Sequence, residues 1–567
     1  MALPRVAAAP AQNSGAMRSN ARRKPRVVAV VALCATLCAT IGCTKVSTSI
    51  GQGVRSQGYP GVLRISDISD PSTLNPMLSG ADVAYQLSAF TLEPLVQLDD
   101  RGRVIPVLCE RVPSRANGDI SPDGLTVTYH LRRGVTWSDN APFGAQDVIA
   151  SWRQVMNPRN NVVIREGYEV VDRIDAPDQW TAVVHLRRPY AAFPTRFFAA
   201  IQEGPVAVMP AHIIAGQREL NTSPFSSHPV GTGPFVLQSW ERNGRMVFVA
   251  NPHYWRGRPG LSQIIFQAQP STATELVGFQ THEIDGDLDA GPGRLPEYST
   301  LTGMRIAQSR SLRLTVGVMN TQRFPFDDVH VRHALAYGID RAAILHDVSH
   351  DAGVVAEEHL PRWSWGYTKD VPRYPFDPGR ARRELEADGW QIGSDGIRVK
   401  GGRQLGGVLV TSAGDLPGAR LAAMAQAYLR AIGMVVTIKS YPYGHIFDND
   451  GPIRTGNYNL AFYSYSVNYD PSALDDDGCD QFAPHGGNDA RFCDPVVDRL
   501  EREALSITDQ SKRKALYAEI QRRRMSSLPT LPVYFRDRVS VVDTSLRDYS
   551  SSWGIIPQWN AWQWTKP

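Results

Sequence analysis

The sequence predicts an α/β protein with more than one lobe. Its 567 residues exceed what one ordinary hydrophobic core accommodates, so two or three lobes are expected. Apolar residues recur at helical spacing over residues 421–432, Gly433 ends the pattern, and residues 435–438 have the composition of a buried strand. A helix packed against a sheet in this way is typical of an α/β lobe.

Three strands are predicted in the first half of the chain. Residues 62–65 form a short apolar run, and residues 125–131 and 180–186 alternate apolar with polar side chains. Because successive side chains of a strand point to opposite faces, this alternation indicates strands that are buried on one face and exposed on the other.

Helix starts are clearer in the second half of the chain. Asp377 is followed by proline, which matches an N-cap residue with proline in the first helical position. Asp328 is predicted to cap a helix over residues 329–345. On that helix, Asp340 and Arg341 are expected to form a solvated or fold-stabilising pair.

The N-terminus has the pattern of an export signal. Basic residues between 18 and 26 precede an apolar stretch at 27–40 that is too short to span a bilayer comfortably. The following Ile-Gly-Cys resembles a bacterial lipobox that ends at Cys43. We therefore expect residues 1–42 to be a lipoprotein signal peptide and residues 43–60 to be a tether. The lipid on Cys43 would hold the protein outside the cytoplasm at a membrane. A plain signal peptide, or an uncleaved anchor, is the alternative.

Removal of that signal changes the charge of the chain. Residues 1–42 contain six Lys or Arg and no Asp or Glu, so the formal charge falls from +4 to −2 on processing. The basic character of the full sequence therefore belongs mostly to the export signal, and no nucleic-acid partner is expected.

The cysteines outside the signal are consistent with an oxidising compartment. Cys479 and Cys493 are the natural disulfide pair, because they would close a short loop rich in Gly, Asp and Asn. Cys109 is expected to be a buried free thiol. No further Cys or His has ligand spacing relative to the pair, so no metal site or cofactor is predicted.

A series of short motifs then carries a family resemblance. In their order and spacing, they resemble the family 5 extracellular solute-binding proteins, the oligopeptide and dipeptide receptors of bacterial ABC importers, from about residue 62 to about residue 542. Each motif alone is weak, but eight or more in order are very improbable by chance. The main segments are residues 121–126, 131–139, 231–235, 251–255, 320–341, 374–390 and 495–517.

The resemblance implies a periplasmic-binding-protein-like fold with two hinged lobes and an additional inserted domain. Such a receptor closes around its ligand by hinge bending, acts as a monomer and delivers the ligand to an ABC permease. The expected ranges are residues 61–95, 223–313 and 537–567 for lobe I, residues 96–222 for the inserted domain, and residues 314–536 for lobe II.

The resemblance also indicates a ligand-facing segment in lobe II. In peptide receptors of this family, an aspartate in this segment pairs with the α-ammonium of the ligand, and the aligned residue here is Asn468. Either Asp470 takes that role after a one-residue shift, or the ligand lacks a free α-amine. Tyr463 stands where tryptophan is usual and keeps an aromatic wall, so Tyr463, Asn468 and Asp470 are the predicted ligand contacts. The acidic run at residues 475–477 is expected to be a solvated loop, with attraction of a cation as the alternative.

Other ligands and another class of function remain open at this stage. Two tryptophan-rich patches, around residues 363–365 and 553–564, are interpreted as packing, with stacking platforms for sugars as the alternative. An oligosaccharide or a metal chelate is therefore a second ligand hypothesis. An exported hydrolase is disfavoured, because the sequence contains no HExxH, no GxSxG and no Ser-x-x-Lys set with its companion motifs. The sequence does not distinguish transport from sensing.

Overall fold

The computed structural model describes residues 60–567 apart from 243, 449, 484 and 485. The predicted signal peptide, Cys43 and residues 44–59 of the predicted tether lie outside these residues. Within the described part of the chain, none of the helices is both long enough and apolar enough to cross a membrane.

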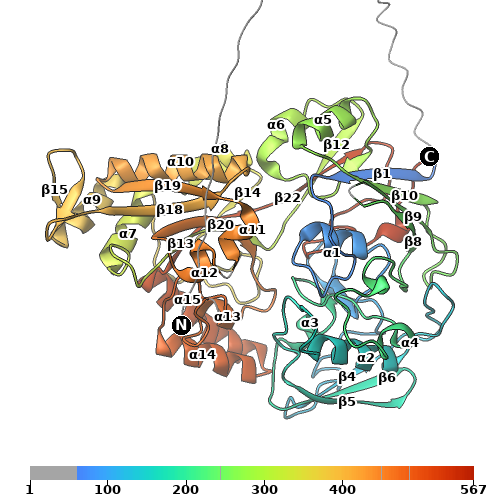
Figure 1. Ribbon diagram of the computed structural model, residues 1–567. Helices are drawn as coiled ribbons and strands as arrows, with labels where there is room; N and C mark the ends of the chain where they lie inside the picture. The colour runs from blue at the N-terminus through green and yellow to red at the C-terminus, as the bar shows by residue number, and fades with distance from the viewer. Residues whose placement is uncertain (1–59, 243, 449, 484–485) are drawn as a thin grey trace, which may run out of the picture. The chain divides into compact units, whose positions relative to one another are not determined.

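A seven-stranded mixed sheet organises the first lobe (Figure 1). Its strand order is β12-β22-β11-β1-β10-β9-β8, and β1 pairs in parallel with both β10 and β11. The strands are β1 (Val62–Asp67), β8 (Phe235–Trp240), β9 (Arg245–Ala250), β10 (Gln263–Ala268), β11 (Gly286–Asp287), β12 (Met304–Ser309) and β22 (Arg538–Asp543). The sheet is thus assembled from three stretches that are far apart in the sequence.

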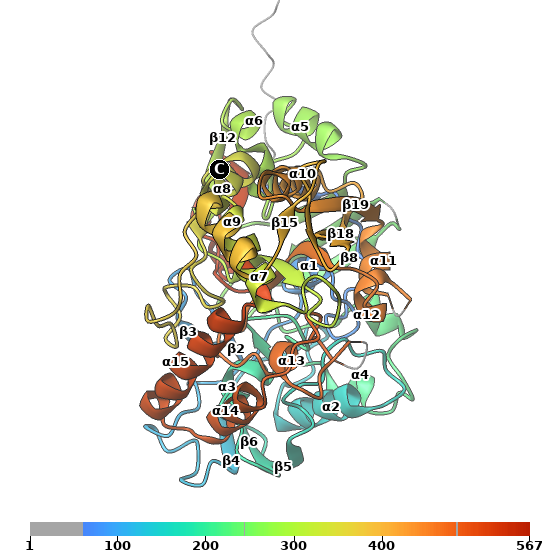
Figure 2. The same cartoon turned by 90° about the vertical axis from the view of Figure 1, so that its left-hand side faces the viewer.

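A six-stranded sheet in the order β14-β21-β13-β20-β18-β19 organises the second lobe. Helices pack against it and against one another; α7 contacts α9, and α14 contacts α15 (Figure 2). The strands are β13 (Arg313–Met319), β14 (Gly353–Val355), β18 (Gly406–Ser412), β19 (Val435–Tyr441), β20 (Leu460–Ser466) and β21 (Thr530–Arg536). The longer helices are α7 (Val329–Gly338), α8 (Arg341–Ser349), α9 (Pro378–Ala387), α10 (Leu416–Ala431), α14 (Pro495–Ser506) and α15 (Gln510–Ser527).

Two small three-stranded sheets lie in the segment that leaves the first lobe after residue 95. Helix α2 (Ala145–Met156) contacts strands β5 and β6 of one of them. The strands are β2 (Val96–Leu98), β3 (Val104–Pro106) and β7 (Ala199–Ala200) in one sheet, and β4 (Thr126–His130), β5 (Val171–Asp178) and β6 (Thr181–Leu186) in the other. The domain boundaries proposed from the sequence stay a prediction.

Shorter elements complete the fold. Strands β15, β16 and β17 form a small sheet of their own. The helices are α1 (Asp82–Ser88), α3 (Phe193–Arg196), α4 (Ala211–Ile214), α5 (Thr272–Gln280), α6 (Leu295–Tyr298), α11 (Tyr443–Phe447), α12 (Pro452–Thr455) and α13 (Leu474–Asp477), and the strands are β15 (Gln391–Ile392), β16 (Arg398–Lys400) and β17 (Arg403–Gln404).

Two short crossings connect the two large sheets. The chain passes from β12 to β13 through residues 310–312 and returns from β21 to β22 through Asp537. Short crossings between two lobes are the geometry in which a few backbone dihedrals absorb hinge motion. The residues that border the crossings, Arg313 and Arg536, are therefore at the base of the space between the lobes.

The helix-and-strand unit of lobe II is where the sequence predicts it, but the predicted burial of the strand at 435–438 is wrong. Strand β19 lies at the edge of the sheet, and Val435 is 38% exposed. Leu421, Ala425 and Leu429 of α10 are buried, and the next strand, β19, pairs in parallel with β18. Gly433 has φ of +88°, the left-handed conformation that glycine adopts without steric cost. The periodic pattern thus predicted the packed face correctly.

The predicted single helix over residues 329–345 is wrong, because the structure contains two helices. Helix α7 ends at Gly338, and the Asp340 side chain accepts a hydrogen bond of 2.9 Å from the Ala343 amide to begin α8. Arg341 does not pair with Asp340 but donates to backbone carbonyls, including that of Ala356 at 2.6 Å. The capping bond of an aspartate thus outweighs continuation of the helix.

Two of the sequence motifs meet at a buried carboxylate and are structural. Glu93 is 5% exposed and accepts hydrogen bonds from Thr232, Tyr254 and Trp255 at 2.7–3.0 Å. Burial raises the pKa of Glu93, and these donors oppose that rise. Neighbouring Gly231 allows the close approach of two backbones, because a Cβ there would lie 1.7 Å from the Thr91 carbonyl oxygen.

Candidate functional site

A cavity of about 740 Å³ is lined by residues from both large sheets and from the intervening segment. This volume is within the range of roughly 300–1,000 Å³ that is usual for small-ligand sites. The first lobe contributes the end of β1 and the start of α1. The second lobe contributes β20, α13, the segment 487–492 and the basic residues Arg524 and Arg536.

Charged groups dominate the polar lining of this cavity. Seven carboxylates and four guanidinium groups face it. The acidic residues are Asp67, Asp82, Glu203, Asp289, Asp476, Asp477 and Asp489, and the basic ones are Arg313, Arg454, Arg524 and Arg536. Such a wall is suited to a ligand that carries charges of both signs, because each ligand charge finds a partner of opposite sign.

One group of these charges lies beside the crossings between the lobes. Arg313 pairs with Asp82 at the start of α1. Arg536 is partly buried and makes no side-chain hydrogen bond or ion pair with any described residue. Burial and the neighbouring Arg313 lower the pKa of Arg536. A carboxylate of a ligand would relieve this repulsion between two guanidinium groups.

A second group lies on α13 and the loop that follows it. Asp477 is 8% exposed and lies 3.1 Å from the Arg524 guanidinium. Burial and the neighbouring Asp477 raise the pKa of Asp476 to about 7, and burial raises that of Asp477 to about 6. The prediction that residues 475–477 form a solvated loop is therefore wrong, because Leu474–Asp477 form a short helix whose last residue is buried.

Tyr463 connects this second group to β20. Its hydroxyl donates a hydrogen bond of 2.8 Å to Asp489 Oδ2. The other oxygen of Asp489 has no hydrogen-bond partner among the described residues, and Arg454 Nη1 lies 3.9 Å from it. Burial raises the pKa of Asp489. A cation brought by a ligand would stabilise the ionised form of this carboxyl group.

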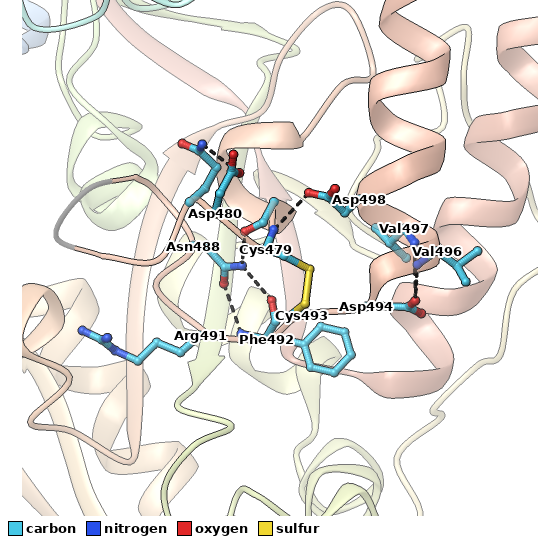
Figure 3. Close-up of a disulfide and its surroundings, with 12 residues drawn as sticks. Cys479, Asp480, Asn488, Arg491, Phe492, Cys493, Asp494, Val496, Val497 and Asp498 are labelled. Atoms are coloured by element: carbon cyan, nitrogen blue, oxygen red, sulfur yellow. Dashed lines mark hydrogen bonds between the residues drawn. A yellow bond between two sulfur atoms is a disulfide. The ribbon is translucent and has the colours of Figure 1, made fainter.

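A disulfide fixes the loop that carries Asp489 (Figure 3). Cys479 and Cys493 are joined with an S–S distance of 2.03 Å, the pairing expected from the sequence. The Asn488 amide donates to the Gly478 and Phe492 carbonyls at 3.1 and 2.7 Å, and thereby links the two ends of the loop (Figure 3). The expected free thiol, Cys109, is fully buried and donates a hydrogen bond to the Leu95 carbonyl.

The structure separates the three ligand contacts predicted from the sequence. Tyr463 lines the cavity, whereas Asn468 and Asp470 are not among the described residues that line it. Asn468 donates a hydrogen bond of 2.8 Å to the Ser472 carbonyl. Asp470 is 8% exposed, and its Oδ1 lies 2.5 Å from Arg513 Nη2. Because β20 ends at Ser466, the chain leaves the cavity wall before it reaches either residue.

Sequence reasoning missed Asp476 and Asp489 as cavity residues. The predicted disulfide could have indicated them, because Asp476 lies just before its first cysteine and Asp489 lies within the loop that it closes. The tryptophan patches behave as the packing interpretation expects. Trp363 makes an edge-to-face contact with Trp553 at 6.1 Å between ring centroids, and Trp564 is fully buried. Among the described residues, no tryptophan lines the cavity.

Comparisons with known proteins agree with this architecture. The family model described as "Bacterial extracellular solute-binding proteins, family 5 Middle" matches residues 103–474. "Di/tripeptide-binding protein 2" of Pseudomonas aeruginosa is 27% identical over 511 residues, covering 84% of this chain and 90% of that protein.

Two solved structures have the same fold. NikZ from Campylobacter jejuni in complex with Ni(L-His) is 23% identical, with a TM-score of 0.78 over 90% of this chain and 100% of that one. The oligopeptide-binding protein AppA from Bacillus subtilis in complex with a nonapeptide is 21% identical, with a TM-score of 0.76 over the same shares. The predicted periplasmic-binding-protein-like α/β fold is confirmed.

Proposed function

The chain belongs to the bacterial extracellular solute-binding proteins of family 5, and from this premise we propose that it captures peptides in the cavity between its lobes and delivers them to an ABC permease. The family is one of substrate-binding proteins. We further propose that the protein binds its ligand without converting it, as a monomer and without a cofactor.

The observation that carries the peptide assignment is the pairing of charges in the cavity. Arg536, beside the crossings, has no described partner and suits a carboxylate. Asp489, on the disulfide loop of the same lobe, has an oxygen without a described hydrogen-bond partner and suits an ammonium group. A zwitterionic peptide supplies both charges on one extended molecule. Related proteins named as di/tripeptide-binding and dipeptide-binding support the same ligand class.

A ligand screen by thermal shift tests this assignment. Free di- to hexapeptides are expected to stabilise the protein by about 2.7 kcal/mol when present at one hundred times their dissociation constant. This gain is enough to raise the melting temperature by several degrees. N-acetylated peptides of the same sequence are the control, because acetylation converts the charged α-ammonium group into a neutral amide. No shift with any peptide, together with a shift from oligosaccharides or a metal chelate, would overturn the peptide assignment.

We also propose that Cys43 carries a lipid that anchors the receptor to a membrane, as the lipobox-like sequence indicates. Cys43→Ser is expected to move most of the protein from the membrane fraction to the soluble fraction of its host cell, because the acyl chains are then missing. Fractionation followed by mass spectrometry of the N-terminal peptide measures this. Cys109→Ser is the matched control. Equal membrane association of the Cys43→Ser protein would contradict the anchor.

A further inference from the structure

We propose that the cavity selects peptides with a basic side chain and that Asp476 is the carboxylate that contacts this side chain. This inference rests on the proposed function and names the substrate class of the same site. It comes from the balance of charges on the cavity wall and from the surroundings of Asp476.

The cavity wall carries more negative than positive groups. Seven carboxylates face four guanidinium groups, so an ordinary zwitterionic peptide leaves the excess uncompensated. Three of the carboxylates already have a close basic partner, since Asp82 pairs with Arg313, Asp477 with Arg524, and Asp289 with Arg538 behind the wall. Four carboxylates then remain against two guanidinium groups, those of Arg454 and Arg536. A ligand with one net positive charge complements the remaining negative charge of the wall better than a neutral or acidic ligand does.

Asp476 is the carboxylate of this excess that is best placed for a ligand. It lies on α13, faces the cavity and makes no side-chain hydrogen bond or ion pair with any described residue. Glu203 is also without such a partner, but it lies beside the Asp82–Arg313 pair, where a second guanidinium group, Arg536, is close. The basic side chain in the surroundings of Asp476 is Arg524, and Arg524 is already paired with Asp477.

A second feature of the same wall points to a cationic ligand. Asp489 is 9% exposed, and one of its oxygens has no hydrogen-bond partner among the described residues. A buried carboxylate oxygen without a donor is costly unless something charged or polar approaches it. Among the described residues, the basic group that lies close to this oxygen is Arg454, at 3.9 Å. The positive charge of a basic side chain that contacts Asp476 would also stabilise the Asp489 carboxylate, and would thereby reduce the free-energy cost of its unpaired oxygen.

An extended organic cation fits this geometry better than a metal ion. Metal coordination requires several ligand atoms within a short distance of one another. Among the described residues, His445, Asp448 and Asp450 form a group with that spacing, and none of them lines the cavity. The cavity acids are thus spread along the wall, where a Lys or Arg side chain of a peptide can reach one of them while its main chain occupies the remaining space.

Isothermal titration calorimetry with three tripeptides tests the charge preference on the unaltered protein. The probes are Ala-Lys-Ala, Ala-norleucine-Ala and Ala-Glu-Ala, of which the first two differ in charge but hardly in size. Ala-Lys-Ala is expected to bind about tenfold or more tightly than the norleucine peptide, as for a charge-assisted contact in a partly buried site. The glutamate peptide is expected to be the weakest. Equal affinities for all three would overturn this inference and leave the peptide assignment intact, whereas no binding by any of them would overturn both.

The variant Asp476→Asn assigns the contact. It is expected to reduce the preference for the lysine peptide to within about threefold while leaving the affinity for the norleucine peptide unchanged. Asp480→Asn is the matched control, because Asp480 lies four residues further along, pairs with Arg502, has a side chain that is 61% exposed and does not line the cavity. A full preference for lysine in Asp476→Asn would remove Asp476 from the site. The melting temperature of each variant shows that it is folded, and the comparison of peptides on the unaltered protein does not depend on either variant.

Discussion

Replacement of Asp470 by alanine is expected to lower the free energy of unfolding by about 3–5 kcal/mol and to leave peptide affinity unchanged. Asp470 and Arg513 form an ion pair in which both side chains are at most 10% exposed. The Tyr517 hydroxyl lies within hydrogen-bond distance of both groups. Removal of the carboxylate therefore leaves a buried guanidinium group without its countercharge.

Urea-induced unfolding and calorimetric titration with a peptide measure the two quantities. The double variant Asp470→Leu, Arg513→Met is the control, because apolar groups in place of both partners are expected to restore much of the lost stability. The opposite pattern, a large loss of affinity with little loss of stability, would return Asp470 to the ligand site. That result would support the first of the two alternatives drawn from the sequence.

The sequence predicts the local elements of this fold better than it predicts the site. Regular periodicity and turn chemistry act locally, so the face of α10, the left-handed Gly433 and the disulfide loop could be predicted from neighbouring residues. The break between α7 and α8 is also local, but two signals competed there. The cap at Asp328 was predicted to begin one helix that continues to residue 345, whereas a second cap at Asp340 begins a separate helix.

The candidate site depends on contacts that no local pattern contains. Asp470 was predicted as a ligand contact from the family resemblance, whereas its carboxylate accepts a hydrogen bond from Arg513, which is 43 residues away in the sequence. Conversely, the acidic run at 475–477 has a composition that is ordinary for a solvated loop. Its burial follows from α14 and α15, which place Arg524 beside Asp477. Family resemblance predicted a ligand cavity between lobes, but it did not predict which charges line it.

Loss of the Cys479–Cys493 disulfide is expected to lower the free energy of unfolding by about 3 kcal/mol. The two cysteines are separated by 14 positions, and a crosslink that closes a loop of about 15 residues removes roughly that much chain entropy from the unfolded state. The double variant Cys479→Ser, Cys493→Ser and the unaltered protein in reductant should agree in urea unfolding. Cys109→Ala, which removes the buried free thiol, is the control for the third cysteine. Unchanged stability in both comparisons would show that the native contacts alone hold the loop.

The same change is expected to weaken peptide binding by more than tenfold, because the loop is also a wall of the cavity. Asp489 and Phe492 lie between the cysteines and line the cavity, while Asp477 lies two residues before the first of them. Without the crosslink, each binding event must order this segment, and the cost of that ordering appears as lost affinity. Titration of Ala-Lys-Ala against the serine variant measures this loss at a temperature where the variant is still folded. Undiminished affinity there would mean that the hydrogen bonds of Asn488 and Tyr463 suffice to hold the wall in place.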